Sequence, residues 1–550
     1  MPKKINYDDW SKDELIKEIK RIKDTTYGLV WHREKEVEEK LDILINPDAR
    51  TPNEMFSNEL KGKPFPVLKE EKNREIITNQ ADPINLLIEG DNYHSLAVLN
   101  FTHQESIDLI YIDPPYNTGN KDFIYNDRFV DNEDPYRHSK WLTFMEKRLR
   151  IAKNLLKDSG LVFISIDDNE YSQLKLLCDE IFGESNFRNS IVVSRVKKNI
   201  QERQYARSLN LGHGFVLFYA MPKAEIVLPT KYQKKEERWH AFDAPGIRKT
   251  MEYEIFGHKP PSGRHWMFEE KKATELIQKG ALRPNLKTGK PQYRLEASDV
   301  TRLDTNWTDL QEGDSKWHFE NGEKNVELIK RIVQMHPSKT CSVLDFFAGS
   351  GTTGQAVLEL NKIDNGDRKF ILCTNNELNG LEKELRARGL KENEINEHGI
   401  CRRFTYPRLK DVISGYKNSR EFDMNGLGGN LKYFSAYDFV EAKETDANKR
   451  KLVNKSTEML CIKENAFELV QENGDFKIFK NCDKFVGIVF YEEAIKGYKE
   501  AIINIEGHFN TYVFSLGDDP HEKEFINVKE KVTLCAIPEV ILKVYREIFK

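Results

Sequence analysis

Apolar and amphipathic segments alternate over two separate stretches of the chain. In the first stretch, apolar runs predict strands at 84–91, 107–116 and 160–167, and helical spacing predicts helices at 92–99, 140–158 and 169–182. In the second, the same criteria predict helices at 326–335 and 353–362 and strands at 342–351 and 368–377. Continuous Val/Ile/Leu strands between helices are typical of a parallel sheet covered on both faces. We therefore predict an α/β fold whose single sheet draws on both stretches.

Other parts of the chain lack this alternation. Residues 191–315 are rich in Lys, Arg, Tyr, Trp and Gly-Pro pairs and interrupt the sheet, while 46–80 has the composition of a surface linker. The spacing of apolar residues in 8–42 predicts an amphipathic helical arm. Short alternating segments after 416, closed by a helix over 537–549, predict a small α+β domain. The predicted organisation is an arm (1–45), a first core half (46–190), an insertion (191–315), a second core half (316–415) and a C-terminal domain (416–550).

Composition narrows the class of protein. The 550 residues exceed what one hydrophobic core usually supports, and 39% hydrophobic residues argue against disorder. We find neither an apolar run of about 18 residues nor a secretory signal, which favours a cytoplasmic location without membrane contact. The seven cysteines form no CxxC pair, so we expect neither a disulfide framework nor a metal site.

Charge is distributed unevenly. The whole chain has a formal net charge of −4, yet residues 191–300 hold 21 Lys+Arg against 12 Asp+Glu, a balance of +9. Such a block can be a solvated face or a phosphate-binding surface.

A glycine-rich segment, Asp345-Phe346-Phe347-Ala348-Gly349-Ser350-Gly351-Thr352, follows a predicted strand and opens a predicted helix. Glycines there allow a tight turn and a close approach of the backbone to a ligand. With Gly354, the segment also satisfies GxGxxG, and Glu377 ends the next strand, so a dinucleotide-binding dehydrogenase is an alternative. A P-loop is excluded because no Lys-Ser/Thr pair follows the glycines.

The tetrapeptide Asp113-Pro114-Pro115-Tyr116 ends another apolar strand. Two prolines could simply terminate the strand, but this does not explain their Asp and Tyr flanks, and a dehydrogenase has no use for them. An exocyclic amine is a poor nucleophile because its lone pair is delocalised into the base. A carboxylate and a rigid backbone carbonyl that accept its two hydrogens would redirect that lone pair, and Tyr116 could stack on a base flipped out of a duplex.

These motifs resemble those of β-class amino-methyltransferases, in which DPPY precedes an FxGxG loop, here Phe347–Gly351. More narrowly, LLIEGDNYHSL, IDLIYIDPPYNTG and VLDFFAGSGTTGQAVLELN resemble modification (Mod) subunits of type III restriction-modification systems. The resemblance implies a Rossmann-like sheet with circularly permuted motif order and an inserted target-recognition domain. It also implies S-adenosylmethionine as donor and adenine N6 in double-stranded DNA as acceptor, with Asp113, Pro114, Pro115 and Tyr116 as catalytic residues.

The resemblance also implies a set of cofactor-binding residues. In this reading Asp91 meets the adenine of the cofactor, Glu377 takes its ribose hydroxyls, and Thr352 bonds its carboxylate or merely caps the helix. The family often has Lys-Pro where this chain has Lys324-Asn325. The full set is Asp91, Lys324, Asp345, Phe346, Phe347, Ala348, Gly349, Ser350, Gly351, Thr352 and Glu377.

By the same resemblance, 191–315 is the target-recognition domain. Its candidate DNA-binding residues are Arg195, Lys197, Lys198, Arg203, Arg207, Lys234, Lys235 and Arg264. We expect a homodimer and an ATP-dependent restriction subunit as partner. Three alternatives stay open: a solitary methyltransferase acting on adenine N6 or cytosine N4, one acting on RNA, and a recognition scaffold that delivers a nuclease subunit.

Overall fold

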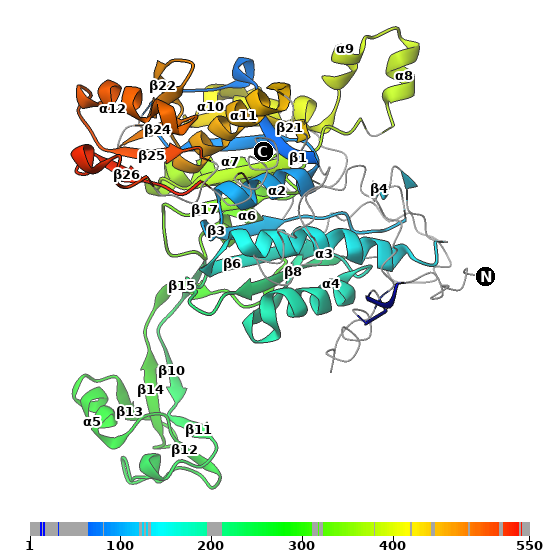
Figure 1. The fold of residues 1–550 in the computed structure, drawn as a ribbon. Helices are drawn as coiled ribbons and strands as arrows, with labels where there is room; N and C mark the ends of the chain where they lie inside the picture. Colours follow the sequence, from blue (N-terminus) through cyan, green and yellow to red (C-terminus); the bar gives the residue numbers. More distant parts are fainter. Residues whose placement is uncertain are drawn as a thin grey trace. The chain divides into compact units, whose positions relative to one another are not determined.

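The computed structural model divides the chain into two compact units, the first made of Met1–Val227 and Thr305–Lys550 and the second of Leu228–Asp304 (Figure 1). Residues 11–13, 15–16, 31 and 541 are described, together with 64–537 except 81, 120–123, 126–127, 130–133, 195–211, 311–316, 318–322, 379, 419–420, 442–445, 482–483 and 516–520.

A ten-stranded sheet organises the first unit. Its strands are, in spatial order, β1 (Pro64–Glu70), β21 (Asn430–Glu441), β2 (Ile84–Glu89), β18 (Lys369–Thr374), β17 (Ser342–Asp345), β3 (Ile107–Ile112), β6 (Leu156–Ile166), β8 (His213–Ala220), β7 (Phe187–Ser194) and β16 (Asn306–Trp307). The six strands from β21 to β6 are parallel to one another, whereas β1, β8 and the pairing of β8 with β7 are antiparallel. The α/β fold and the joint sheet are therefore confirmed.

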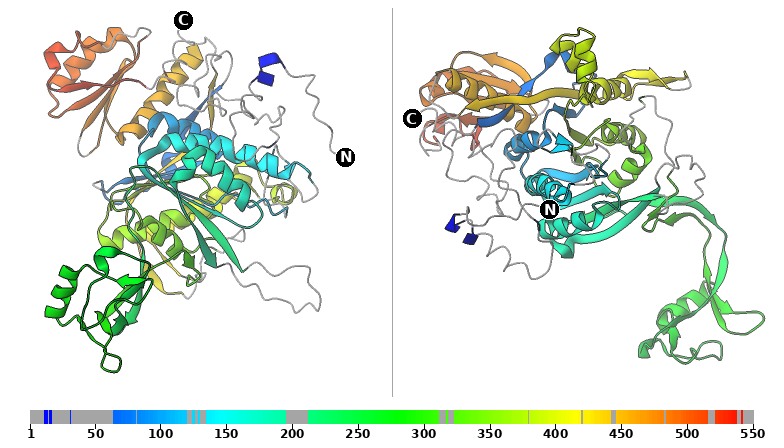
Figure 2. Two further views of the ribbon diagram at one scale, coloured as in Figure 1. Left: turned by 90° about the horizontal axis from the view of Figure 1, so that it is seen from below. Right: turned by 90° about the vertical axis from the view of Figure 1, so that its right-hand side faces the viewer.

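Helices connect the parallel strands by crossovers in two directions. Helix α2 (Asn92–Thr102) leads from β2 to β3, and α3 (Arg137–Leu155) leads from β3 to β6. Helix α7 (Thr352–Asp364) runs the opposite way along the sheet, from β17 to β18. Because such crossovers are right-handed, α2 and α3 lie on one face and α7 on the other. Helix α6 (Val326–Val333) and α10 (Tyr406–Ser414) pack against α7, and α4 (Tyr171–Cys178) packs against α3 (Figure 2).

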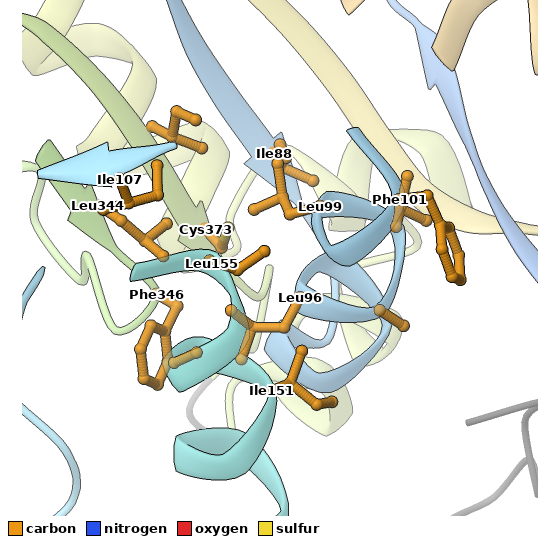
Figure 3. Close-up of a cluster of buried hydrophobic side chains, with 14 of the residues drawn as sticks. Ile88, Leu96, Leu99, Phe101, Ile107, Ile151, Leu155, Leu344, Phe346 and Cys373 are labelled. Carbon is orange, nitrogen blue, oxygen red and sulfur yellow. The ribbon is translucent and has the colours of Figure 1, made fainter. Parts of the chain in front are cut away.

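Apolar side chains of both core halves fill the space between the sheet and α2 and α3. Figure 3 shows part of this cluster, with Ile88, Leu96, Leu99, Phe101, Ile107, Ile151, Leu155, Leu344, Phe346 and Cys373 labelled. All of them are nearly or fully buried. Residues separated by more than 200 positions thus share one core, which fixes the two halves of the sheet relative to each other.

The sheet recruits segments that the sequence analysis placed elsewhere. Strand β1 lies in the expected linker, and β21 lies inside the expected C-terminal domain. The large sheet also contains β8, whose apolar residues Val216–Tyr219 are buried, together with β7, which crosses position 191, and β16. The separate compact unit accordingly spans 228–304, which is shorter than the expected 191–315. The expected bounds were too wide because the apolar run of β8 lies within a segment that is otherwise basic.

The second unit has a small core of its own, which contains Phe242, Ile255, Trp266, Ala273 and Leu282. Strands β9 (Thr230–Lys235) and β15 (Ser298–Arg302) pair where the chain enters and leaves the unit. Beyond them lie β10 (Arg238–Ala241), β11 (Asp243–Pro245), β12 (Arg264–Trp266), α5 (Glu270–Gln278), β13 (Leu282–Pro284) and β14 (Pro291–Leu295).

A second mixed sheet follows α11 (Asp446–Glu464). Its order is β22 (Glu468–Glu472), β23 (Phe476–Lys480), β24 (Phe485–Val489), β25 (Phe509–Val513) and β26 (Val532–Leu534), and α12 (Ile495–Ile503) precedes β25. Shorter elements are β4 (Ile124–Tyr125), β5 (Arg128–Phe129), α8 (Glu382–Ala387), α9 (Glu392–Asn396), β19 (Gly415–Lys417) and β20 (Asp423–Asn425). Most of the expected arm and of the closing helix lies outside the described residues. Within the described part of the chain, no helix has the length and apolar character needed to cross a membrane.

Candidate active site at the ends of four parallel strands

The carboxyl ends of four neighbouring strands carry the residues singled out by the sequence. In the order β2, β18, β17 and β3, these ends lead to Asp91, Glu377, Asp345 and Asp113. All four strands are parallel, so their ends lie along one edge of the sheet. Ligands of open α/β sheets bind at this edge. The register therefore brings together two motifs that are more than 200 residues apart in sequence.

The DPPY loop, Asp113–Tyr116, is held by its own side chains and by α3. The Tyr116 hydroxyl donates to Asp113 Oδ1 at 2.8 Å, and the indole of buried Trp141 donates to the Pro115 carbonyl at 2.7 Å. The Asp113 carboxylate, its side chain 24% exposed, remains accessible. The loop thus presents a partly accessible carboxylate on a backbone fixed by two prolines and an indole.

Asn117 anchors the end of this loop. It adopts a φ of +55°, is fully buried, and donates to Glu170 Oε1 at 2.5 Å and to the Arg137 carbonyl at 3.3 Å. His138 Nδ1 lies 2.6 Å from the same Glu170 oxygen. Burial raises the pKa of Glu170 although these neighbours favour its ionised form. A buried carboxyl therefore fixes the chain direction directly after Tyr116.

The glycine loop, Phe347–Gly351, follows β17. Gly349 and Gly351 have φ values of +49° and +81°, a region that favours glycine. Thr405, in the helical turn before α10, donates to the Gly349 carbonyl at 2.5 Å. A Cβ atom at Gly351 would lie 3.1 Å from the Thr405 methyl carbon, so the close approach of Thr405 also requires glycine there.

Asp345 lies beneath the glycine loop. It is buried and accepts hydrogen bonds from the Phe347 amide at 3.0 Å and from the Thr353 hydroxyl at 2.5 Å. Burial raises its pKa to about 7, with a smaller contribution from the negative charge of nearby Asp113. Asp345 therefore shapes the loop from inside and is electrostatically coupled to the DPPY loop.

A buried arginine of α10 supports the other side of the glycine loop. Arg408 is 1% exposed and donates to the hydroxyls of Ser350 at 3.1 Å and Thr352 at 3.0 Å. It also bonds to Gln355 at 2.8 Å and to Glu323 at 2.6 Å. The Thr352 hydroxyl thus faces the protein interior, and Gly351 rather than Thr352 is the N-cap residue of α7.

Asp91 and Asn92 connect the end of β2 to the glycine segment. Asp91 caps α2 by accepting from the Tyr93 amide at 2.7 Å, and its side chain is 51% exposed. The Asn92 amide donates to the Phe346 carbonyl at 2.9 Å. Buried Arg148 of α3 bonds to Asn92 at 2.5 Å and to Asp91 at 3.2 Å, so one arginine orients both side chains.

Glu377 lies beyond the end of β18, with Asn375 hydrogen-bonded to its carboxylate. Glu377 is exposed, but neighbouring atoms partly desolvate its carboxylate, and this raises its pKa. The negative charge of nearby Asp91 raises the pKa further. Asp91 and Glu377 therefore form a pair of solvent-accessible acceptors on adjacent strand ends.

Lys324 contacts the DPPY loop. Its ammonium group lies 2.7 Å from the Tyr116 hydroxyl and 3.0 Å from Asp113 Oδ1, and 4.9 Å from the centre of the Tyr116 ring. The expected role of Lys324 in the cofactor site stays a prediction beside these contacts. Asn325, which replaces the proline frequent in the family, caps α6 by accepting from the Glu327 amide at 2.7 Å.

The expected DNA-binding residues fall into two groups. Arg195, Lys197, Lys198, Arg203 and Arg207 lie outside the described residues. In the second unit, Lys234 is exposed and Lys235 donates to Thr301 at 2.8 Å. Arg264 is paired with the Asp243 carboxylate and donates to the Asp243 carbonyl at 3.0 Å. Arg264 therefore stabilises the pairing of β11 with β12.

Several residues that support the site were not anticipated. Arg148 follows Trp141 and Met145 on the buried stripe of α3, and a charged residue in such a stripe is a signal that the sequence does offer. Arg408 similarly lies on the buried face of α10. Thr405 and Glu170 have no comparable signal, because polar residues directly before a helix are common.

Residues 107–377 match the family model for DNA methylases. This stretch includes both loops and the strands that carry them. This part of the chain is thus similar to DNA methylases, and in it the DPPY strand precedes the glycine-loop strand in sequence and lies beside it in the sheet.

Three relatives illustrate how far the similarity extends. The Mod subunit of the type III enzyme StyLTI from Salmonella typhimurium is 31% identical over 53% of this chain and 52% of its own length. The EcoPI Mod subunit of Escherichia phage P1 is 29% identical over 74% of this chain and 75% of its own length. The type II methyltransferase M.KpnI of Klebsiella pneumoniae is 29% identical over 52% of this chain and 79% of its own length. This chain thus aligns with about half of the length of the StyLTI subunit.

Proposed function

We propose that this protein transfers a methyl group from S-adenosylmethionine to N6 of adenine in double-stranded DNA. The observation that carries the proposal is the placement of the DPPY loop directly beside the glycine loop, at the ends of the paired strands β3 and β17. A dinucleotide-dependent dehydrogenase would need the glycine loop but not Asp113–Tyr116.

The residues of the edge fit S-adenosylmethionine. The glycine loop offers a backbone that a ligand can approach closely, followed by the positive end of α7, which suits a carboxylate. Asp91 and Glu377 offer accessible carboxylate oxygens for amine and hydroxyl donors. When bound, the cofactor supplies an electrophilic methyl group on a sulfonium.

The chain's own groups then activate the amine. The Asp113 carboxylate and the Pro114 carbonyl accept hydrogen bonds from the two N–H groups of the amine. These bonds draw the nitrogen lone pair out of conjugation with the ring and towards the methyl group. The Tyr116 ring stacks on the flipped base, and its hydroxyl keeps Asp113 in place. Methyl transfer would form the N–C bond as the S–C bond breaks and leaves a neutral thioether, and the cationic amine would release one proton through the Asp113 carboxylate to water.

We further propose that residues within 191–315, including the 228–304 unit, contact the duplex, with their Lys and Arg residues positioning phosphates. Similarity to the StyLTI and EcoPI Mod subunits supports a role as the modification and recognition subunit of a type III system, in a homodimer that also binds a restriction subunit. A solitary methyltransferase is the second candidate, since the similar M.KpnI is named a type II methyltransferase and not a Mod subunit.

The chemistry is tested by incubating the purified chain with duplex DNA and labelled S-adenosylmethionine, then digesting the DNA to nucleosides. We expect label in N6-methyladenine. Label in N4-methylcytosine, or transfer only to RNA, would replace the proposed substrate, and tight NAD binding without S-adenosylmethionine binding would restore the dehydrogenase alternative.

The assembly is tested separately by light scattering. We expect a dimer at micromolar concentration. A monomer that still methylates DNA would rule out an obligate dimer, and co-purification of a restriction subunit would separate the type III candidate from the solitary enzyme.

A further inference from the structure

Three consecutive residues before α6 contact three different parts of the molecule. Glu323 accepts from buried Arg408 at 2.6 Å, Lys324 contacts the DPPY loop, and Asn325 caps α6. The segment 323–325 re-enters the core after the inserted block. It is therefore anchored to a helix at its end, while Lys324 reaches the DPPY loop and Glu323 reaches Arg408.

The Lys324 contact closes a triangle within the DPPY loop. The Tyr116 hydroxyl donates to Asp113 Oδ1, and the Lys324 ammonium donates both to that carboxylate oxygen and to the hydroxyl. An ion pair of this kind fixes Asp113 Oδ1 and leaves the second oxygen of Asp113 to orient towards an incoming amine.

The Glu323 contact reaches the glycine loop through one intermediate. Arg408 joins the Glu323 carboxylate to the hydroxyls of Ser350 and Thr352, and Arg408 is almost fully buried. A buried guanidinium needs a charged partner to stay in place, so Glu323 determines where Arg408 holds the loop.

We propose that Glu323 and Lys324 are positioning residues that couple the two loops, setting the distance between the methyl donor and the amine that receives the methyl group. Peptide geometry keeps neighbouring Cα atoms 3.8 Å apart, so a shift of either side chain's anchor is transmitted to the other. This inference rests on the proposed function. It assigns Lys324 to the amine side of the reaction instead of to cofactor binding.

The test uses the full chain with Lys324→Met, Glu323→Gln and the double variant. Asp158→Asn and Lys223→Met serve as matched controls, since this ion pair lies 3.1 Å apart and both of its side chains are exposed. The measurements are kcat for methyl transfer to duplex DNA, the Kd of S-adenosylmethionine by calorimetry, and Tm. Lys324→Arg tests whether a positive charge at this position is sufficient to restore kcat.

We expect Lys324→Met to lower kcat on the order of tenfold to a hundredfold with an unchanged cofactor Kd, and Lys324→Arg to recover part of the loss. Glu323→Gln should weaken cofactor binding about tenfold and also lower kcat. The double variant should lose less kcat than the product of the single losses, since coupled residues are not additive. The control variants should behave as the wild type.

Three results would overturn the inference. These are an unchanged kcat in Lys324→Met, a weaker cofactor Kd in that variant, and strictly multiplicative losses in the double variant. If Glu323→Gln does not fold, Ser350→Ala replaces it, because this change removes one Arg408 contact with the loop. A wild-type chain that transfers no methyl group to DNA would instead refute the proposed function itself.

Discussion

The DPPY loop and the glycine loop follow neighbouring parallel strands, yet they are held by different means. The DPPY loop owes its rigidity to two prolines and to contacts from Trp141 and Glu170, which lie within about 60 residues of it. The glycine loop has positive φ values and is held by Thr405 and Arg408, which also follow it by fewer than 60 residues. Each core half thus supplies several supports of its own loop, while Lys324 and Asn92 connect the two halves.

The two loops also differ in what a substitution would disturb. In the proposed mechanism the DPPY loop acts through the side chains of Asp113 and Tyr116 as well as the Pro114 carbonyl, so side-chain changes there should affect chemistry. In the glycine loop the backbone itself forms the site, so added side chains should affect cofactor binding. The following predictions test this division of roles.

The largest effect is expected for Asp113→Ala. Loss of a site-organising acceptor should lower kcat at least 10²- to 10³-fold, while the Kd of S-adenosylmethionine changes less than about twofold. Tyr116→Phe should lose less, because it keeps the stacking ring. Asp158→Ala, an exposed aspartate paired only with exposed Lys223, serves as control. Wild-type rates in Asp113→Ala would remove the catalytic assignment.

Gly351→Val should act on the other loop. A side chain at φ +81° is strained by about 1–3 kcal/mol and would press on Thr405, so we expect weaker cofactor binding and a lower Tm. Gly389 has a similar φ of +82°, and no atom lies within 4 Å of a Cβ added there. Gly389→Val therefore measures the effect of backbone strain without a steric contact. Equal loss of cofactor binding in both variants would show that the contact with Thr405 has no role.

Trp141→Phe should produce a moderate effect on the DPPY loop. The change removes the hydrogen bond to the Pro115 carbonyl and some buried volume, at a cost of about 1–3 kcal/mol in the free energy of unfolding. We expect kcat to fall several-fold at an unchanged cofactor Kd, measured as for Asp113→Ala. A loss confined to cofactor binding would contradict the division between the loops.

The smallest effect is a pH dependence of stability due to Asp345. Its pKa is raised from 3.8 to about 7, so the folded chain binds this proton more tightly than the unfolded chain. The resulting stabilisation is full below about pH 4 and is lost as the pH rises through about 7. The Tm of the wild type relative to Asp345→Asn should therefore fall between pH 5 and pH 8. A Tm difference independent of pH would contradict the raised pKa.

The sequence was sufficient for the parts of the fold that repeat one pattern. The apolar runs that became β2, β3, β17 and β18 place Asp91, Asp113, Asp345 and Glu377 at strand ends without reference to tertiary structure. The roles assigned to these residues stay predictions until variants are measured. The expected absence of a metal site and the expected cytoplasmic location likewise stay predictions.

The parts that could not be predicted depend on packing between distant segments. Strand β21 joins the sheet beside β2, more than 300 residues earlier, and nothing local in its sequence indicates that pairing. The contact of Lys324 with the DPPY loop could likewise not be predicted from local sequence, because Tyr116 and Lys324 are 208 residues apart. Register and side-chain partners of this sort follow from the completed core.

The most direct test of the whole account is genome-wide detection of modified bases in cells that carry the wild-type gene or the Asp113→Ala variant. The account predicts N6-methyladenine at every copy of one short sequence with the wild type, and its absence with the variant. Unmodified adenine with the wild type, N4-methylcytosine in its place, or N6-methyladenine that persists with Asp113→Ala would contradict it.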